Sequence, residues 1–230
     1  MIYDVIIIGA GPAGLAAGLL LEKEKVQYVI LEKGKDLLRR NVRNPEDVAS
    51  GIGGSGLFSD GKLSFPPSAS EMWGKLDGRE LKAAYLFLKQ TLDGLGIIIP
   101  DWEEQWRKTE PIEGEKEYCS IVFNDFLRNR ILNSFYDKNR PYTFSDSEVV
   151  AISDMQTYYE VTVKNGKLYQ GRNLIIASGK YGNRILSHFK IQKQINKIEL
   201  GIRLEIPSEY FKPCEKSLED FKVIKRITDG

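Results

Sequence analysis

The strongest constraint on the fold is an apolar run that leads directly into a glycine-rich turn near the N-terminus. Residues 4–18 read DVIIIGAGPAGLAAG. The β-branched start of this run predicts a buried central strand, and Pro12 suits the first position of a following helix, where no N–H partner is needed. Gly9 allows a tight turn, Gly11 lets the backbone approach a ligand, and Gly14 lets helix and strand pack closely.

A second predicted strand, Tyr28–Leu31, follows the helix and ends at Glu32. In a dinucleotide-binding unit, an acid about 20 residues after the glycines hydrogen-bonds the ribose, and the helix N-terminus faces the pyrophosphate. The order of strand, glycine turn, helix, strand and acid therefore predicts a dinucleotide site rather than a merely structural turn. The cofactor-binding candidates in this unit are Gly9, Gly11, Pro12, Ala13, Gly14, Glu32 and Lys33.

A second glycine-rich segment occupies residues 50–65. Its glycines repeat the same spacing, but no apolar strand precedes them and no helical period follows. Lys62 has the spacing of a Walker A lysine, yet Leu63 stands where that loop needs Ser or Thr, which argues against a nucleoside triphosphatase. Backbone amides of such a loop can touch a flat ligand. The cofactor-binding candidates here are Gly51, Gly53, Gly54, Ser55 and Gly56.

Three arginines, Arg39, Arg40 and Arg43, lie between the two glycine-rich segments. They are either part of a solvated loop, or one of them neutralises a pyrophosphate, because a guanidinium presents a rigid fork to phosphate oxygens. The sequence leaves both interpretations open. Arg43 is the cofactor-binding candidate of this group.

Composition excludes several classes of function. The 33 Lys and Arg residues nearly balance the 32 Asp and Glu residues, so no long-range field draws the chain to nucleic acid or an anionic membrane. The apolar stretch Val5–Leu21 is interrupted by glycine and proline, which favours a core strand and helix over a membrane span, and a cytoplasmic protein is expected. Two separated cysteines, Cys119 and Cys214, and one histidine, His188, predict no disulfide framework, no metal site and no Ser-His-Asp triad. His188 is expected on a helix surface or in packing.

The middle of the chain predicts helices. Amphipathic patterns extend over residues 79–94 and 121–136, and Gly94 ends the first of them. Trp102 and Trp106 lie between the two patterns, where they either line a substrate cavity or pack in a core. Residues 66–141 are therefore predicted to be a helical insertion.

Strand patterns return after the insertion. Asn165-Gly166 predicts a two-residue hairpin turn within this region, and 173–179 predicts a further buried strand that ends in small residues. Small residues at a strand end admit a ligand or a close backbone crossing. The short predicted strands before it are Val149–Ile152, Tyr158–Val163 and Leu168–Gln170.

In this order, the motifs resemble those of flavoprotein oxidoreductases whose FAD domain is of the glutathione-reductase type. The sequence IIASG at 175–179 is similar to the A-T-G motif of that superfamily, with Ser178 retaining the hydroxyl of the usual Thr. More narrowly, SGIGGSGLFSDGKL at 50–63 and IELGIRLEIP at 198–207 resemble the FAD-dependent dehydrogenase family, whose substrates are poorly characterised.

The resemblance implies FAD as the cofactor, with Glu32 at the adenosine ribose and the Val149 backbone at the adenine edge. Residues 51–62 would lie near the isoalloxazine ring. Lys62 is the catalytic candidate, as a cation that stabilises reduced flavin, and a solvated loop lysine is the alternative. The remaining cofactor-binding candidates are Ala177, Ser178 and Gly179.

The implied fold is α/β: a Rossmann-like FAD-binding domain with a parallel sheet and a β-meander, built from residues 1–65 and 142–190. Residues 66–141 would be the helical insertion, and 191–230 the start of a mixed, incomplete substrate domain. Members of the superfamily carry a Gly-Asp motif in a longer C-terminal half. The chain is therefore expected to be C-terminally truncated.

The expected function is an FAD-dependent oxidoreductase, a dehydrogenase or reductase that acts on a small organic substrate, with NAD(P)H as a candidate electron donor. One alternative is a flavin- or nucleotide-binding module without turnover, because the closing half of the site is missing. Another is an NAD-linked dehydrogenase, against which the predicted hairpin meander argues. The substrate and the oligomeric state are not fixed by the sequence.

Overall fold

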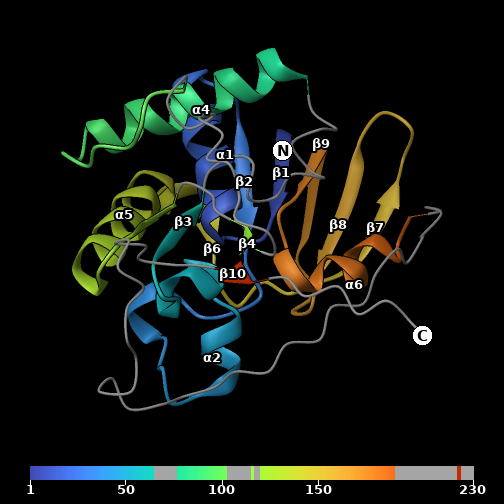
Figure 1. Cartoon of the computed structure of the whole chain (residues 1–230). Helices are drawn as coiled ribbons and strands as arrows, with labels where there is room; N and C mark the ends of the chain where they lie inside the picture. The colour runs from blue at the N-terminus through green and yellow to red at the C-terminus, as the bar shows by residue number, and fades with distance from the viewer. Residues whose placement is uncertain (65–76, 103–114, 117–119, 190–221, 224–230) are drawn as a thin grey trace, which may run out of the picture. The chain divides into compact units, whose positions relative to one another are not determined.

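The computed structural model describes residues 1–64, 77–102, 115–116, 120–189 and 222–223 (Figure 1). The chain divides into two compact units. The first comprises Met1–Gly61 and Phe123–Ile191, and the second comprises Lys62–Val122 and Gln192–Gly230. The boundaries of the FAD-binding domain, the insertion and the substrate domain stay a prediction.

The first unit contains a six-stranded sheet in the order β6-β2-β1-β9-β8-β7, which can be followed from β2 to β7 in Figure 1. Neighbouring strands from β6 to β9 run parallel, and those from β9 to β7 run antiparallel. This arrangement confirms the predicted α/β, Rossmann-like fold with a parallel sheet and a meander. The strands are β1 (Ile2–Ile8), β2 (Tyr28–Leu31), β6 (Thr143–Phe144), β7 (Val149–Asp154), β8 (Tyr159–Val163) and β9 (Leu168–Ile176).

Strand β9 joins the parallel and antiparallel parts of the sheet. The sequence predicted two strands here, 168–170 and 173–179, which was wrong because the ladder with β1 continues from Gln170 to Ile176. A Cβ on Gly171 would lie 2.6 Å from Ile6 Cγ1. The small residue that interrupts the apolar pattern therefore marks a close crossing with β1, not a turn.

Strand β1 is buried on both faces, as expected for a central parallel strand. Ile6 and Ile8 pack into a core with residues of the meander, including Val161. Ile7 faces the opposite side, where its Cγ2 would lie 3.3 Å from a Cβ on Gly14 of helix α1 (Pro12–Lys23). The continuous β-branched run in the sequence thus packs on both faces of the sheet, against the meander residues on one face and against α1 on the other.

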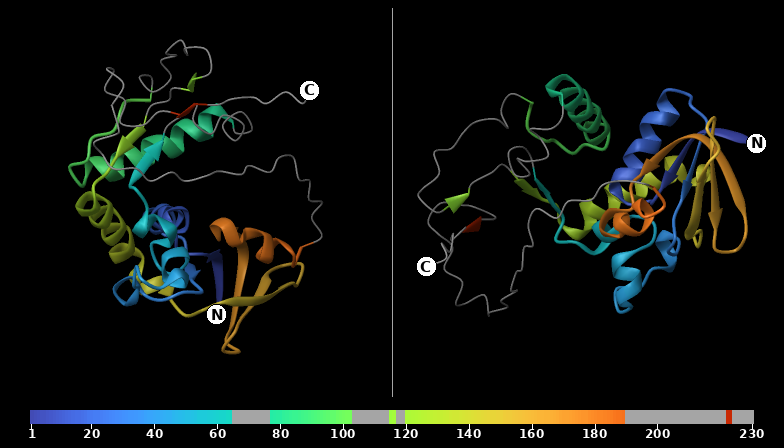
Figure 2. Two further views of the ribbon diagram at one scale, coloured as in Figure 1. Left: turned by 60° about the horizontal axis from the view of Figure 1, so that its bottom comes forward. Right: turned by 90° about the vertical axis from the view of Figure 1, so that its right-hand side faces the viewer.

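Helix α5 (Asp125–Asn139) packs against α1 (Figure 2). The buried Asn139 amide donates to the Leu15 carbonyl at 3.0 Å, and the Tyr28 hydroxyl donates to Asn139 Oδ1 at 2.8 Å. Gly18 makes this approach possible, because a Cβ there would lie 2.0 Å from Asn139 Oδ1. Burial raises the pKa of Tyr28, so its hydroxyl stays a neutral donor.

The predicted helix at 121–136 begins later than expected. Strand β5 (Ser120–Val122) precedes it, and α5 begins after Asn124, whose side chain accepts from the Leu127 N–H. Asn is a favoured N-cap, and β-branched Ile121 fits the short strand better than a helix. The remaining helical segments of the first unit are α2 (Pro45–Ala49), α6 (Gly182–Leu186), η1 (Leu37–Arg39), η2 (Gly54–Phe58), η3 (Arg140–Tyr142) and η4 (Gly179–Tyr181).

The second unit contains α4 (Gly78–Asp93) and two pairs of short antiparallel strands. Helix α4 ends at Gly94, as the sequence predicted, and the Tyr85 hydroxyl donates to the Pro100 carbonyl at 2.6 Å. Across the described parts of both units, no helix is long and apolar enough to cross a membrane. The strand pairs are β3 (Lys62–Ser64) with β5, and β4 (Glu115–Lys116) with β10 (Lys222–Val223).

Candidate functional site

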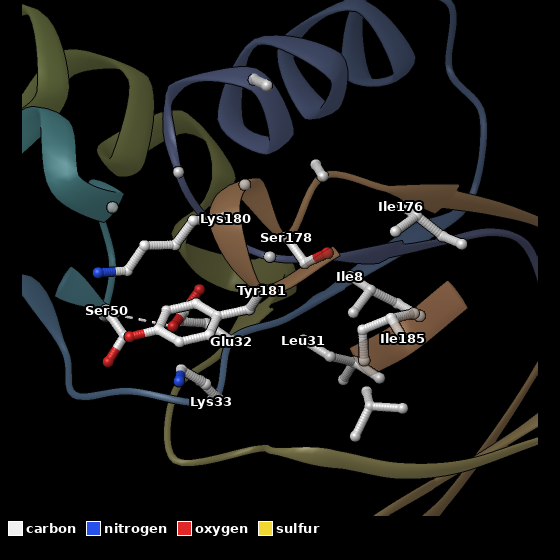
Figure 3. Close-up of a pocket in the computed structure, with 18 of the residues that line it drawn as sticks. Ile8, Leu31, Glu32, Lys33, Ser50, Ile176, Ser178, Lys180, Tyr181 and Ile185 are labelled. Atoms are coloured by element: carbon white, nitrogen blue, oxygen red, sulfur yellow. Dashed lines mark hydrogen bonds between the residues drawn. The ribbon is translucent and has the colours of Figure 1, made fainter. Parts of the chain in front are cut away.

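A pocket of about 460 Å³ opens where the carboxyl ends of β1, β2 and β9 meet in the first unit (Figure 3). Ligands of open α/β sheets bind in the crevice outside the carboxyl ends of the strands. The structure brings together thirteen of the candidate residues in the wall of this pocket: Gly9, Gly11, Pro12, Ala13, Glu32, Lys33, Gly51, Gly54, Ser55, Val149, Ala177, Ser178 and Gly179.

The three glycines of the N-terminal turn have different surroundings. Gly9 has φ +106°, and a Cβ there would lie 2.6 Å from the Ala177 carbonyl oxygen. A Cβ on Gly14 would lie 1.9 Å from the Gly9 carbonyl oxygen, so Gly14 packs the helix on the turn and does not line the pocket. Around Gly11 the nearest atom to such a Cβ is 3.8 Å away, on Gly54. Gly11 is thus the glycine of the three that leaves room for a ligand.

Helix α1 presents its N-terminus to the pocket. Gly11 is the N-cap and makes no side-chain capping hydrogen bond, and the first turn contains no acidic residue. The N–H groups of a first helical turn have no partner within the helix, and together with the helix dipole they favour an anion. This end of the pocket therefore suits a phosphate group.

Glu32 lies in the pocket wall and connects three segments of backbone. Its carboxylate accepts hydrogen bonds from the N–H groups of Ala10, Gly34 and Gly51, each at 2.9 Å, and the residue is 6% exposed. Two carboxylate oxygens offer about four acceptor positions, so about one remains for a ligand hydroxyl. Sequence reasoning assigned only a ribose contact to Glu32, and the structure adds a role in joining the βα turn to the glycine-rich loop.

The glycine-rich loop forms one wall of the pocket. The Gly53 N–H donates to the Ala10 carbonyl at 2.8 Å, which ties the loop to the N-terminal turn. Gly51 and Gly54 line the pocket with φ of +113° and +56°, which L side chains rarely adopt. Gly53 and Gly56 were candidates as well, but they lie outside the pocket lining.

Arg40 fixes the shape of this loop. Its buried guanidinium donates to the backbone carbonyls of Asp47, Val48 and Ile52. Burial lowers the pKa of Arg40, and the charges of Glu32 and Asp47 partly oppose that effect. Because the guanidinium of Arg40 already donates to three backbone carbonyls, it positions the loop and is not available to bind a pyrophosphate.

The other two arginines do not line the pocket either. Arg39 forms an exposed ion pair with Asp146, and Arg43 is exposed and outside the pocket lining. The structure therefore brings none of the three guanidiniums into the predicted phosphate position. Proximity in sequence to the candidate site therefore did not place these side chains in the pocket.

The buried Asp47 carboxylate connects α2 to the segment that follows β2. Its Oδ2 accepts from Lys35 Nζ at 2.9 Å and from the Asn41 N–H at 3.0 Å. The hydrogen bond from Lys35 is the main reason that the pKa of Asp47 lies below its ordinary value. This carboxylate thus holds residues on both sides of η1 against α2.

The end of β9 closes the opposite wall. The Ala177 N–H donates to the Ile8 carbonyl at 2.8 Å, which continues the ladder to the edge of the pocket. The buried Ser178 Oγ has no hydrogen-bond partner among the described residues. An unpaired buried hydroxyl in a pocket wall is a ready contact for a polar ligand group.

Sequence reasoning missed several pocket residues, among them Ser147, Glu148, Lys180, Tyr181 and Arg184. A signal was available for Lys180 and Tyr181, because a chain that leaves the carboxyl end of a central strand must pass the ligand crevice. Arg184 lines the pocket from α6, a helix of five residues that is too short to show a helical hydrophobic period in the sequence.

Other predicted residues lie elsewhere. Lys62 belongs to the second unit, in β3 opposite Val122, so its role near a flavin stays a prediction. His188 is exposed in the turn after α6. Trp106, Cys119, Cys214 and the motif at 198–207 lie outside the described residues.

Residues 2–43 match the family model of the FAD binding domain. Together with the sheet and the pocket, this match indicates that the first unit has a Rossmann-like FAD-binding fold. The chain is similar in sequence to a thioredoxin reductase and to an FAD-dependent monooxygenase.

Thioredoxin reductase of Ureaplasma parvum is 31% identical over 146 residues, covering 57% of this chain and 47% of that protein. The FAD-dependent monooxygenase ltmM of Epichloe festucae is 24% identical over 205 residues, which cover 86% of this chain and 38% of that protein. The chain therefore spans less than half the length of these curated relatives. Among solved structures, OTEMO in complex with FAD and NADP is similar with a TM-score of 0.43 and 17% identity, covering 77% of this chain and 26% of that one.

Proposed function

We propose that the chain is the FAD-binding part of an FAD-dependent oxidoreductase that acts on a small organic substrate. The observation that carries the proposal is that the N-terminal turn, Glu32 and the end of β9 line one pocket. The similarity to thioredoxin reductase and to an FAD-dependent monooxygenase supports this class.

The residues present fit FAD. The open N-terminus of α1 and the space beside Gly11 would hold the diphosphate, and the free acceptor position of Glu32 would take a ribose hydroxyl. The unpaired Ser178 hydroxyl and the Val149 backbone would contact the remaining polar edges. Bound FAD supplies hydride or electron transfer, and the protein supplies binding, orientation and electrostatics. Lys62 stays the proposed cation near the flavin, with NAD(P)H as the proposed electron donor.

The test is a set of direct titrations of the purified chain with FAD, FMN and NAD, followed by absorption spectra. We expect the tightest binding for FAD. Equal or tighter binding of NAD would refute the assignment. Anaerobic addition of NADH or NADPH to the FAD-loaded chain then separates two classes: bleaching of the flavin band supports an oxidoreductase, whereas stable binding without bleaching favours a flavin-binding module without turnover.

A further inference from the structure

Tyr181 lines the pocket at the same end as Glu32 and Lys33 (Figure 3). It ends η4, the single turn that closely follows β9, so the strand end at Ile176 places the ring at this part of the crevice. Among the described pocket-lining residues, Tyr181 is the one aromatic side chain. The pocket therefore offers one flat π surface to a ligand.

Three cations surround the Tyr181 ring. Lys33 Nζ lies 3.4 Å from the ring centroid, Lys180 Nζ lies 5.2 Å from it, and Arg184 Cζ lies 5.8 Å from it. Within the described part of the chain, none of these three residues forms an ion pair with a carboxylate. The negative face of the ring attracts the cations, and their positive field would also attract a phosphorylated ligand.

The position of Glu32 tells which part of a ligand would meet the ring. If Glu32 takes the ribose of FAD, the base attached to that ribose extends from this end of the pocket, while the diphosphate lies toward Gly11 and the N-terminus of α1. Adenine is a flat π system, and aromatic side chains stack on nucleobases without reading their edges.

We propose that Tyr181 is the stacking surface for the adenine ring of FAD and that it determines the preference for FAD over FMN. The inference rests on the proposed FAD binding and assigns a specific residue to its adenosine end. Lys33 holds the ring in place through the 3.4 Å contact, and Lys180 and Arg184 add positive charge beside it.

The experiment compares Tyr181→Leu, Tyr181→Gln and Tyr181→Phe with the parent chain, by fluorescence titration with FAD and FMN and by competition with ADP. Loss of one base–aromatic stack should weaken FAD and ADP binding by about 5-fold to 150-fold in the Leu and Gln variants. Binding of FMN, which has no adenine, should not change, and Tyr181→Phe should bind FAD like the parent. Tyr158→Leu, at the β7–β8 turn outside the pocket lining, is the matched control and should have no effect.

Thermal melting of each variant establishes that it is folded, and the Gln variant provides the same test if the Leu variant does not fold. Unchanged FAD affinity in a folded Leu or Gln variant would overturn the inference and leave the proposed function standing. An equal loss of FAD and FMN affinity would also overturn it, because the ring would then serve the flavin end. Failure of the parent chain to bind FAD would instead refute the proposed function itself.

Discussion

Replacing Glu32 by glutamine should destabilise the protein even without a cofactor. The carboxylate accepts three backbone hydrogen bonds, two on Oε1 from Gly34 and Gly51 and one on Oε2 from Ala10. Glutamine has nearly the same shape, but it keeps one acceptor oxygen and places an NH₂ group at the other position. That group would face the Ala10 N–H, donor against donor.

The magnitude follows from these three bonds. A lost hydrogen bond to a charged acceptor costs about 1.5–3 kcal/mol, and each of the two remaining bonds weakens by about 1 kcal/mol when its acceptor becomes neutral. The expected loss in the free energy of unfolding is therefore about 4 kcal/mol. This is a large fraction of the stability of an ordinary domain, which is about 5–15 kcal/mol.

The assay is urea unfolding followed by circular dichroism in the absence of FAD. Glu148→Gln is the control, because Glu148 lines the same pocket but its side chain is 42% exposed and pairs with Lys164 at 3.5 Å. Such a surface pair contributes about 0–1 kcal/mol. If Glu32→Gln unfolds at the same urea concentration as Glu148→Gln and the parent, the three bonds do not stabilise the fold. If the variant has normal stability but no longer binds FAD, Glu32 serves cofactor binding only and does not stabilise the fold.

Three further predictions concern residues that support the pocket from outside its lining. Arg40→Lys should weaken FAD binding in calorimetric titrations and lower the melting temperature, because an ammonium group cannot donate to the three backbone carbonyls at once. Unchanged FAD binding would show that the loop keeps its shape without the guanidinium group. The lowered pKa of Asp47 stabilises the fold above the ordinary Asp pKa of about 3.9, and this contribution is lost as the pH falls through the lowered value. The urea midpoint of the parent should therefore fall on going from about pH 6 to about pH 3, and this fall should be smaller in Asp47→Asn. An equal fall of the urea midpoint in both proteins would contradict the prediction. Gly14→Ala should cost about 3 kcal/mol or more in urea unfolding, because its Cβ would lie 1.9 Å from the Gly9 oxygen, whereas Gly78→Ala, with open space around it, should be neutral or stabilising.

The sequence by itself determined the βαβ unit and much of the pocket. A β-branched run, a glycine turn and an acid at the end of the second strand are local features, and each restricts the backbone where it stands. For that reason β2 was predicted with its observed bounds, and the α/β class followed from the order of the motifs. The small residues at 177–179 likewise indicated a ligand edge before the strand order was known.

The tertiary structure decided which side chains reach the ligand and which hold the walls. Arg40 and Arg43 are three residues apart, yet one is buried against loop carbonyls and the other is exposed outside the pocket. Tyr181 lines the same pocket as Glu32 and contacts Lys33 because β2 and β9 both pair in parallel with β1, which brings their carboxyl ends to one edge of the sheet although they are far apart in sequence. Side-chain direction depends on such long-range pairing and on the burial that follows from it, and neither is encoded in the local sequence pattern.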